Sequence, residues 1–190
     1  MQYLLMIGLS LLLHLLFPHI DTTENSLLED LQAVVIALAM LLYLYRIIYG
    51  HRLQQRIINT GIALLLFSFL IRELDVEEFM VLPEMMRYYL GKEGKDITMG
   101  ILWGSYILFY MVGTREKLKQ WRIFWGSREG SLWACAFVLL LLSQMMDKNV
   151  LHLHHHLNRY YEEFWELFSY MYIMIAAWSG MRQTGQSAGL

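Results

Sequence analysis

The sequence predicts an all-α fold: a polytopic transmembrane helical bundle of about six membrane-spanning helices with short interfacial helices. Of its 190 residues, 57% are hydrophobic and 17% are charged, whereas a soluble domain has about 25% charged residues. The apolar residues gather in long runs separated by short charged segments. One cysteine and a net charge of −2 exclude a disulfide scaffold and a basic nucleic-acid-binding domain.

The lengths of the apolar runs favour membrane-spanning helices. A helix crossing the hydrocarbon core needs about 20 mostly apolar residues, or roughly 17 when flanking side chains extend to the interface. Six segments are predicted to span, the third and fifth being short: Tyr3–Ile20, Leu27–Ile48, Ile57–Ile71, Ile97–Val112, Leu132–Met146 and Phe164–Trp178. The first has no basic region before it and no small-residue cleavage site after it, so we expect a retained helix rather than a signal peptide.

The segments between the spans also carry structural signals. Asp75–Asp96 has apolar residues at helical spacing, which predicts an interfacial helix broken at Pro83. Arg115–Gly130 mixes basic and aromatic residues, which is typical of an amphipathic segment at the inner leaflet. Residues 1–182 are predicted to form one transmembrane domain, followed by a flexible tail over 183–190.

The charge distribution predicts the orientation. Nine of the fifteen Lys and Arg residues, but only two of the seventeen carboxylates, fall in the segments after the second, fourth and sixth spans. Because basic loops stay in the cytoplasm, both termini are predicted to be cytoplasmic and the acidic face to lie outside. The short loops favour a bacterial plasma (inner) membrane.

This topology places polar residues of five helices, most of them ionisable, near the outer boundary. They are His14 and His19, then Glu29, Asp30 and Gln32, then Arg72, Glu73 and Asp75, then Gln144 and Asp147, and finally Glu162, Glu163 and Glu166. An ionisable group inside the bilayer costs roughly 2.5–3.5 kcal/mol, so such groups usually face a cavity or a partner. We therefore expect a polar cavity formed by His14, Glu29, Arg72, Glu73, Asp75 and Glu166. The alternative is that the helix ends simply emerge into water there, with Arg72 neutralising Glu73 or Asp75.

A histidine-rich segment precedes the last span. If Asp147–Glu166 is helical, His152, His156, Arg159 and Glu163 share one stripe. Two histidines one turn apart can chelate Zn²⁺, and Glu163 or Asp147 are the candidate catalytic residues that would take a proton from a metal-bound water. The alternative is a histidine-rich surface run that binds metals only adventitiously.

Three functions remain open at this point. The first is a protein whose outward-facing acidic and histidine cavity binds or moves a cation, a proton or a small molecule. The second is a zinc-dependent membrane hydrolase that acts on an outer-leaflet lipid. The third is a non-catalytic subunit of a membrane complex, in which the polar residues pair with a protein partner. The expected partners are membrane lipids and a membrane protein, and no nucleic acid.

Overall fold

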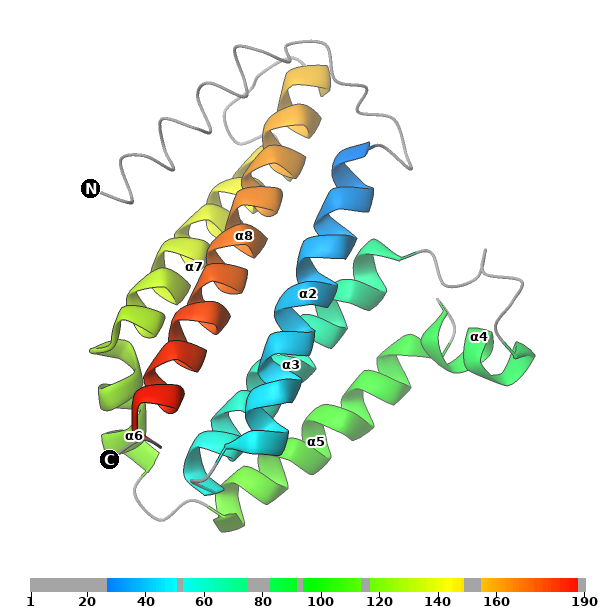
Figure 1. The fold of residues 1–190 in the computed structure, drawn as a ribbon. Helices are drawn as coiled ribbons and strands as arrows, with labels where there is room; N and C mark the ends of the chain where they lie inside the picture. The colour runs from blue at the N-terminus through cyan, green and yellow to red at the C-terminus, as the bar shows by residue number, and fades with distance from the viewer. Residues whose placement is uncertain are drawn as a thin grey trace.

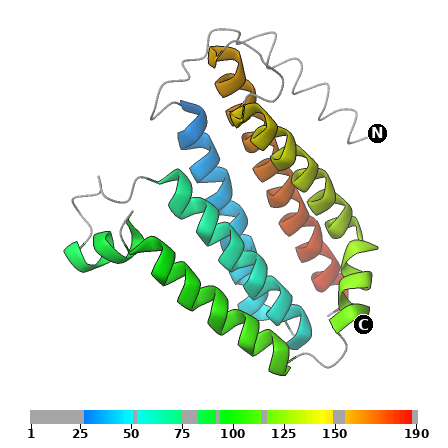
Figure 2. The ribbon, with the colours of Figure 1, turned by 180° about the vertical axis from the view of Figure 1, so that it is seen from behind.

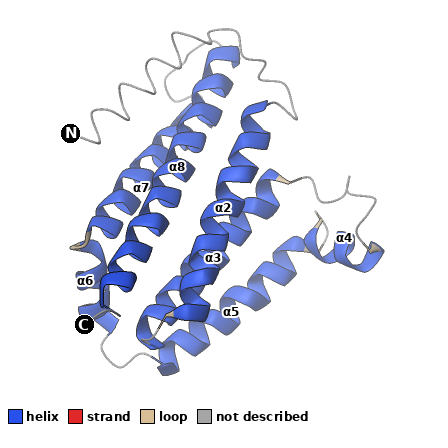
Figure 3. Cartoon of the chain, viewed as in Figure 1, coloured by secondary structure: helices blue, strands red, loops and turns tan. Residues whose placement is uncertain are grey.

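The structure, a computed structural model, describes residues 27–50, 53–74, 83–91, 94–113, 117–148 and 155–187. These residues form seven α-helices, and no strand occurs among them (Figure 3). The helices are α2 (Leu27–Tyr49), α3 (Leu53–Glu73), α4 (Glu84–Leu90), α5 (Lys95–Gly113), α6 (Lys117–Trp125), α7 (Arg128–Asp147) and α8 (His155–Ser187). The all-α prediction is therefore confirmed for the described part of the chain.

Five of the six predicted spans coincide with helices α2, α3, α5, α7 and α8, and the first, Tyr3–Ile20, lies outside the described residues. Within the described ranges, three helices are long and apolar enough to cross a membrane. These stretches are Leu28–Tyr49, Gln55–Glu73 and Arg128–Asp147, in α2, α3 and α7. The structure thus supports fewer spans than the sequence predicts, because α5 opens with two charged residues and the first half of α8 carries four.

The long helices pack side by side in the order α7, α8, α2 and α3, with α5 beyond α3 (Figures 1 and 2). Neighbouring helices in this row share a core that contains Ile36, Leu66, Trp133, Tyr170 and Ile173. α8 contacts α7 and α2, and α2 contacts α8 and α3, so α8 and α2 are the inner helices of the bundle. α5 packs mainly on α3 and leaves most of its apolar surface exposed.

One buried stripe of α2 sets the position of the polar groups. Gln32, Ile36, Ala39, Tyr43 and Arg46 recur at alternating spacings of four and three, and each is buried. This spacing places them on one helix face. The stripe begins at Gln32, which donates to Glu163 of α8, and ends at Arg46, which pairs with Glu129 of α7. α2 therefore carries a buried polar group at both ends of the stripe.

The two predicted interfacial segments contain short helices. α4 begins directly after Pro83 and has no buried residue. α6 lies within Arg115–Gly130, but the end of that predicted segment belongs to α7, whose N-cap Ser127 accepts a hydrogen bond from the Gly130 amide at 3.1 Å. At the C-terminus, α8 continues to Ser187, into the segment predicted as a tail.

Candidate functional site

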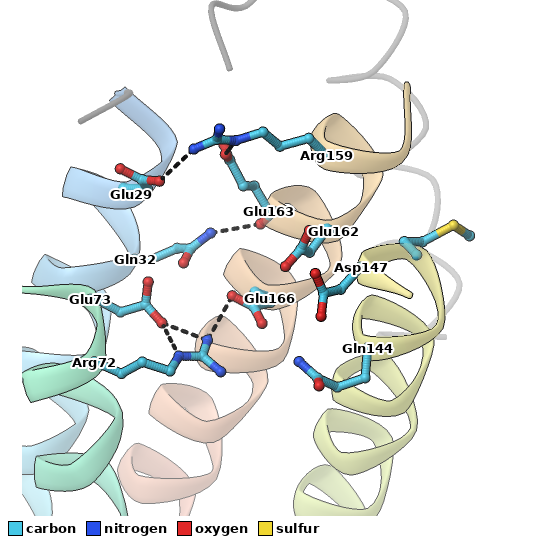
Figure 4. Close-up of a pocket in the computed structure, with 11 residues that line it drawn as sticks. Glu29, Gln32, Arg72, Glu73, Gln144, Asp147, Arg159, Glu162, Glu163 and Glu166 are labelled. Atoms are coloured by element: carbon cyan, nitrogen blue, oxygen red, sulfur yellow. Dashed lines mark hydrogen bonds and ion pairs between the residues drawn. The ribbon is translucent and has the colours of Figure 1, made fainter. Parts of the chain in front are cut away.

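The antiparallel packing brings four helix ends together around a polar cavity of about 500 Å³ (Figure 4). The N-terminal parts of α2 and α8 meet the C-terminal ends of α3 and α7 there. The lining residues are Glu29, Gln32, Arg72, Glu73, Gln144, Met146, Asp147, Arg159, Glu162, Glu163 and Glu166. Residues that are up to 137 positions apart in the sequence, such as Glu29 and Glu166, thus line one cavity.

The structure brings together six of the sequence-predicted site residues. Of the predicted cavity residues, Glu29, Arg72, Glu73 and Glu166 line the cavity, and the candidate catalytic residues Glu163 and Asp147 line it as well. His14, Asp75 and His152 lie outside the described residues. His156 falls within α8, but its side chain is not described.

Arg72 joins α3 to α8 across one wall of the cavity. Its Nη2 lies 2.6 Å from Glu73 Oε1 and 2.8 Å from Glu166 Oε2. The same nitrogen donates to the Tyr170 hydroxyl at 3.1 Å, and this hydroxyl donates to Glu73 Oε1 at 3.2 Å. Ser143 of α7 donates to the other oxygen of Glu166 at 3.0 Å. The buried Glu166 carboxylate is therefore held from α3 and α7, in addition to its own helix.

Arg159 joins α8 to α2 at a second wall. Its Nε donates to Glu163 Oε1 at 3.1 Å, one helical turn along, and its Nη2 lies 3.5 Å from Glu29 Oε1. The Gln32 side-chain amide donates to the Glu163 backbone carbonyl at 2.8 Å. Since Glu163 is ion-paired and only 6% exposed, its carboxylate balances a guanidinium in this structure.

Asp147 and Glu162 face each other from α7 and α8 (Figure 4). Among the described residues, neither forms an ion pair. Glu162 precedes the predicted span Phe164–Trp178, and its pKa is raised to about 7, first by partial burial and then by the charges of Asp147, Glu166 and Glu163. This carboxylate therefore changes its charge near neutral pH.

The described residues contain no group of three His, Cys, Asp or Glu side chains arranged to hold a metal ion. The predicted zinc ligands His152 and His156 have no described side chains, so the zinc site stays a prediction. The described part of its stripe, Arg159 and Glu163, forms the ion pair given above.

A second buried polar cluster lies at the opposite end of the bundle. Arg46 of α2 and Glu129 of α7 form a two-pronged ion pair, Nη1–Oε1 2.6 Å and Nη2–Oε2 2.9 Å. Tyr43 donates to Glu129 Oε1 at 2.9 Å, and the Trp133 indole donates to the Tyr43 hydroxyl at 2.8 Å. Arg46 and Glu129 belong to the charges that the sequence analysis assigned to the segments after the second and fourth spans. That assignment was wrong, because both lie inside helices and are at most 7% exposed.

Ser143 and Tyr170 were missed by the sequence analysis, although a signal for both was present. Ser143 lies one helical turn before Asp147, and Tyr170 lies one turn after Glu166. Residues four apart share a helix face. A search along the helix from each carboxylate would therefore have found both hydroxyls.

The chain matches no known protein family, no curated protein and no solved structure. Its function is therefore inferred from the site itself.

Proposed function

We propose that the chain is a multi-pass membrane protein whose acidic cavity binds a small cation. The observation that carries this proposal is the charge of the lining, which contains six carboxylates and only two guanidinium groups. Arg72 and Arg159 already pair with carboxylates of Glu73, Glu166, Glu163 and Glu29. The excess negative charge is concentrated in a concave site, where low-dielectric walls strengthen its attraction for a cation.

The protein surface supports the membrane part of the proposal. Besides its three candidate spans, the chain leaves large apolar side chains exposed along whole helices, among them Leu38 and Leu41 of α2 and Ile101, Leu108 and Val112 of α5. Soluble monomers rarely expose contiguous apolar patches larger than a few hundred Å². Lipid is the environment in which such a surface is stable.

The proposed orientation places the cavity at the outer face of a bacterial plasma membrane. The basic helix α6 lies by the start of α7, at the end opposite the cavity, and a basic segment is expected on the cytoplasmic side. The cavity then receives its cation from outside the cell. Transfer across the membrane, rather than binding alone, is measured by uptake into proteoliposomes.

The test is isothermal titration calorimetry on the full chain in lipid nanodiscs, with the chlorides of Na⁺, K⁺, Mg²⁺, guanidinium and 1,4-diaminobutane as probes. We expect saturable binding of at least one cation. In the double variant Asp147→Asn, Glu162→Gln, its affinity should fall at least tenfold, or about 1.4 kcal/mol. Both substituted groups line the cavity, and no ion pair of either occurs in the described part of the chain.

The matched control is the double variant Glu84→Gln, Asp96→Asn, which removes two exposed carboxylates on α4 and α5 that do not line the cavity. Its affinity should equal that of the wild type. If no cation in the series binds, or if the two double variants weaken binding equally, the proposal is wrong.

A further inference from the structure

Gln32 presents a buried side-chain oxygen to the acidic cavity. Its side chain is 1% exposed and lines the cavity, and its Oε1 has no hydrogen-bond partner among the described residues. The orientation of the amide is determined, because the Glu163 backbone carbonyl 2.8 Å away accepts a hydrogen bond and so requires the NH₂ group. The oxygen is therefore the atom that remains for a ligand (Figure 4).

Most of the other groups that remain for a ligand are also acceptors, and Gln144 adds an amide that has both a donor and an acceptor. Asp147 and Glu162 present carboxylates from α7 and α8, on the wall across from Gln32 (Figure 4). The two cationic side chains of the lining already donate to its glutamates. A ligand that complements this lining must therefore supply hydrogen-bond donors as well as positive charge.

The size of the cavity favours a polyatomic ligand. About 500 Å³ falls in the range of small-molecule sites, roughly 300–1,000 Å³, and greatly exceeds the volume of a single metal ion. A metal ion also needs several oxygen ligands in its immediate shell. No such cluster exists among the residues that the structure describes.

From these observations we propose that the cavity recognises an organic cation with N–H donors, a primary ammonium or a guanidinium group. Its charge lies by Asp147 and Glu162, and one of its N–H groups donates to Gln32 Oε1. This inference rests on the proposed cation-binding function and names the class of cation. Gln32 is the residue that distinguishes a donor-bearing cation from other cations of equal charge.

The experiment compares two cations that have the same charge and the same carbon spacer. One is 1,4-diaminobutane, and the other is its fully N-methylated, bis-quaternary analogue, which has no N–H group. Both are titrated into the full chain in nanodiscs. We expect the diamine to bind at least tenfold more tightly, since donors from a charged group form the stronger hydrogen bonds.

The variant Gln32→Met keeps the approximate shape of the side chain and removes the acceptor. It should weaken binding of the diamine and bring the ratio of the two affinities below about threefold, because one charge-assisted hydrogen bond is lost. The control, Tyr43→Phe, removes a buried hydroxyl from the Arg46–Glu129 cluster at the other end of the bundle. It should leave the ratio unchanged.

The outcomes separate the two proposals. Equal affinity for the diamine and its quaternary analogue in the wild type, or binding of inorganic cations alone, overturns this inference and leaves the proposed cation site standing. Absence of binding by every cation overturns both. Since the wild-type ratio is decisive by itself, the test does not depend on whether the Gln32 variant folds.

Discussion

Arg46 and Glu129 form an ion pair inside the bundle, with Nη1–Oε1 2.6 Å and Nη2–Oε2 2.9 Å, and it connects α2 to α7 at the end opposite the acidic cavity. The two residues are 83 positions apart. The geometry is the parallel, two-pronged arrangement that guanidinium and carboxylate groups form best. The pair therefore aligns the end of α2 with the start of α7.

Removing one partner of this pair should strongly destabilise the protein. Glu129→Gln leaves the 5%-exposed Arg46 without a counter-charge, and breaking a buried pair costs about 3–5 kcal/mol. Denaturant unfolding in detergent micelles measures the loss. The exposed carboxylate of Glu84 provides the control, since Glu84→Gln should change the free energy of unfolding by less than about 0.5 kcal/mol. Similar values for the two variants would contradict a stabilising role for the pair.

The same cluster requires a glycine on α8. A Cβ at Gly180 would lie 2.6 Å from Arg46 Cζ and 2.6 Å from Glu129 Oε2. Gly180→Ala should therefore lower the free energy of unfolding by about 1–3 kcal/mol, the usual cost of overpacking. Gly104→Ala is the matched control, because nothing lies within 4 Å of a Cβ there and alanine favours a helix by roughly 0.5–1 kcal/mol. Thermal unfolding of both variants should give shifts of opposite sign.

Cation binding should increase with pH through neutrality. The pKa of Glu162 is raised to about 7 by its partial burial and by Asp147, Glu166 and Glu163, so the cavity gains one negative charge as this group ionises. Calorimetry at pH 5.5 and pH 8.5 should give tighter binding at the higher pH. Asp147→Asn removes the largest repulsive charge, so it should lower the pKa of Glu162. The rise in cation affinity should then occur at lower pH than in the wild type. If the pH dependence of cation affinity is the same in this variant as in the wild type, a group other than Glu162 is responsible for it.

Glu162 also predicts how stability depends on pH. Its folded-state pKa exceeds the ordinary value of 4.5, so the folded protein holds this proton more tightly than the unfolded chain. The contribution of Glu162 to the free energy of unfolding therefore decreases as pH rises from about 4.5 to about 7. Glu162→Gln removes this contribution, and the difference between wild type and variant should vary over that range. If the difference in free energy of unfolding between wild type and variant does not change with pH, the raised pKa of Glu162 is contradicted.

Tyr170 should stabilise the cavity wall through its hydroxyl. The hydroxyl accepts from Arg72 at 3.1 Å and donates to Glu73 at 3.2 Å, and the side chain is fully buried. Tyr170→Phe should lower the free energy of unfolding by about 0.5–1.5 kcal/mol. Tyr45→Phe, at a side chain that is 52% exposed, is the control and should have no measurable effect. Equal stability of the two variants would indicate that the Tyr170 hydroxyl contributes nothing to the wall.

The sequence pattern predicted the long helices well, because long runs of apolar residues favour the α-helical conformation. The predicted segments Leu27–Ile48 and Leu132–Met146 correspond to α2 and α7 within a few residues at each end. The prediction failed for charges near helix ends. Glu129 fell within the predicted amphipathic segment Arg115–Gly130 between two spans, whereas it lies in the first turn of α7 and faces Arg46. Composition alone does not distinguish a charge in a loop from a charge on the first turn of a helix.

The amino-acid sequence by itself determined that the chain is helical and which carboxylates reach a common end of the bundle, because hydrophobic periodicity sets where helices begin and end. Only the tertiary structure decided which charges pair. Arg72 pairs with Glu73 and Glu166, Arg159 pairs with Glu163 and Glu29, and Asp147 and Glu162 are left facing each other. The reason is physical: a pair forms only where two side chains approach within a few ångströms, and that depends on how the helices are rotated and packed against each other.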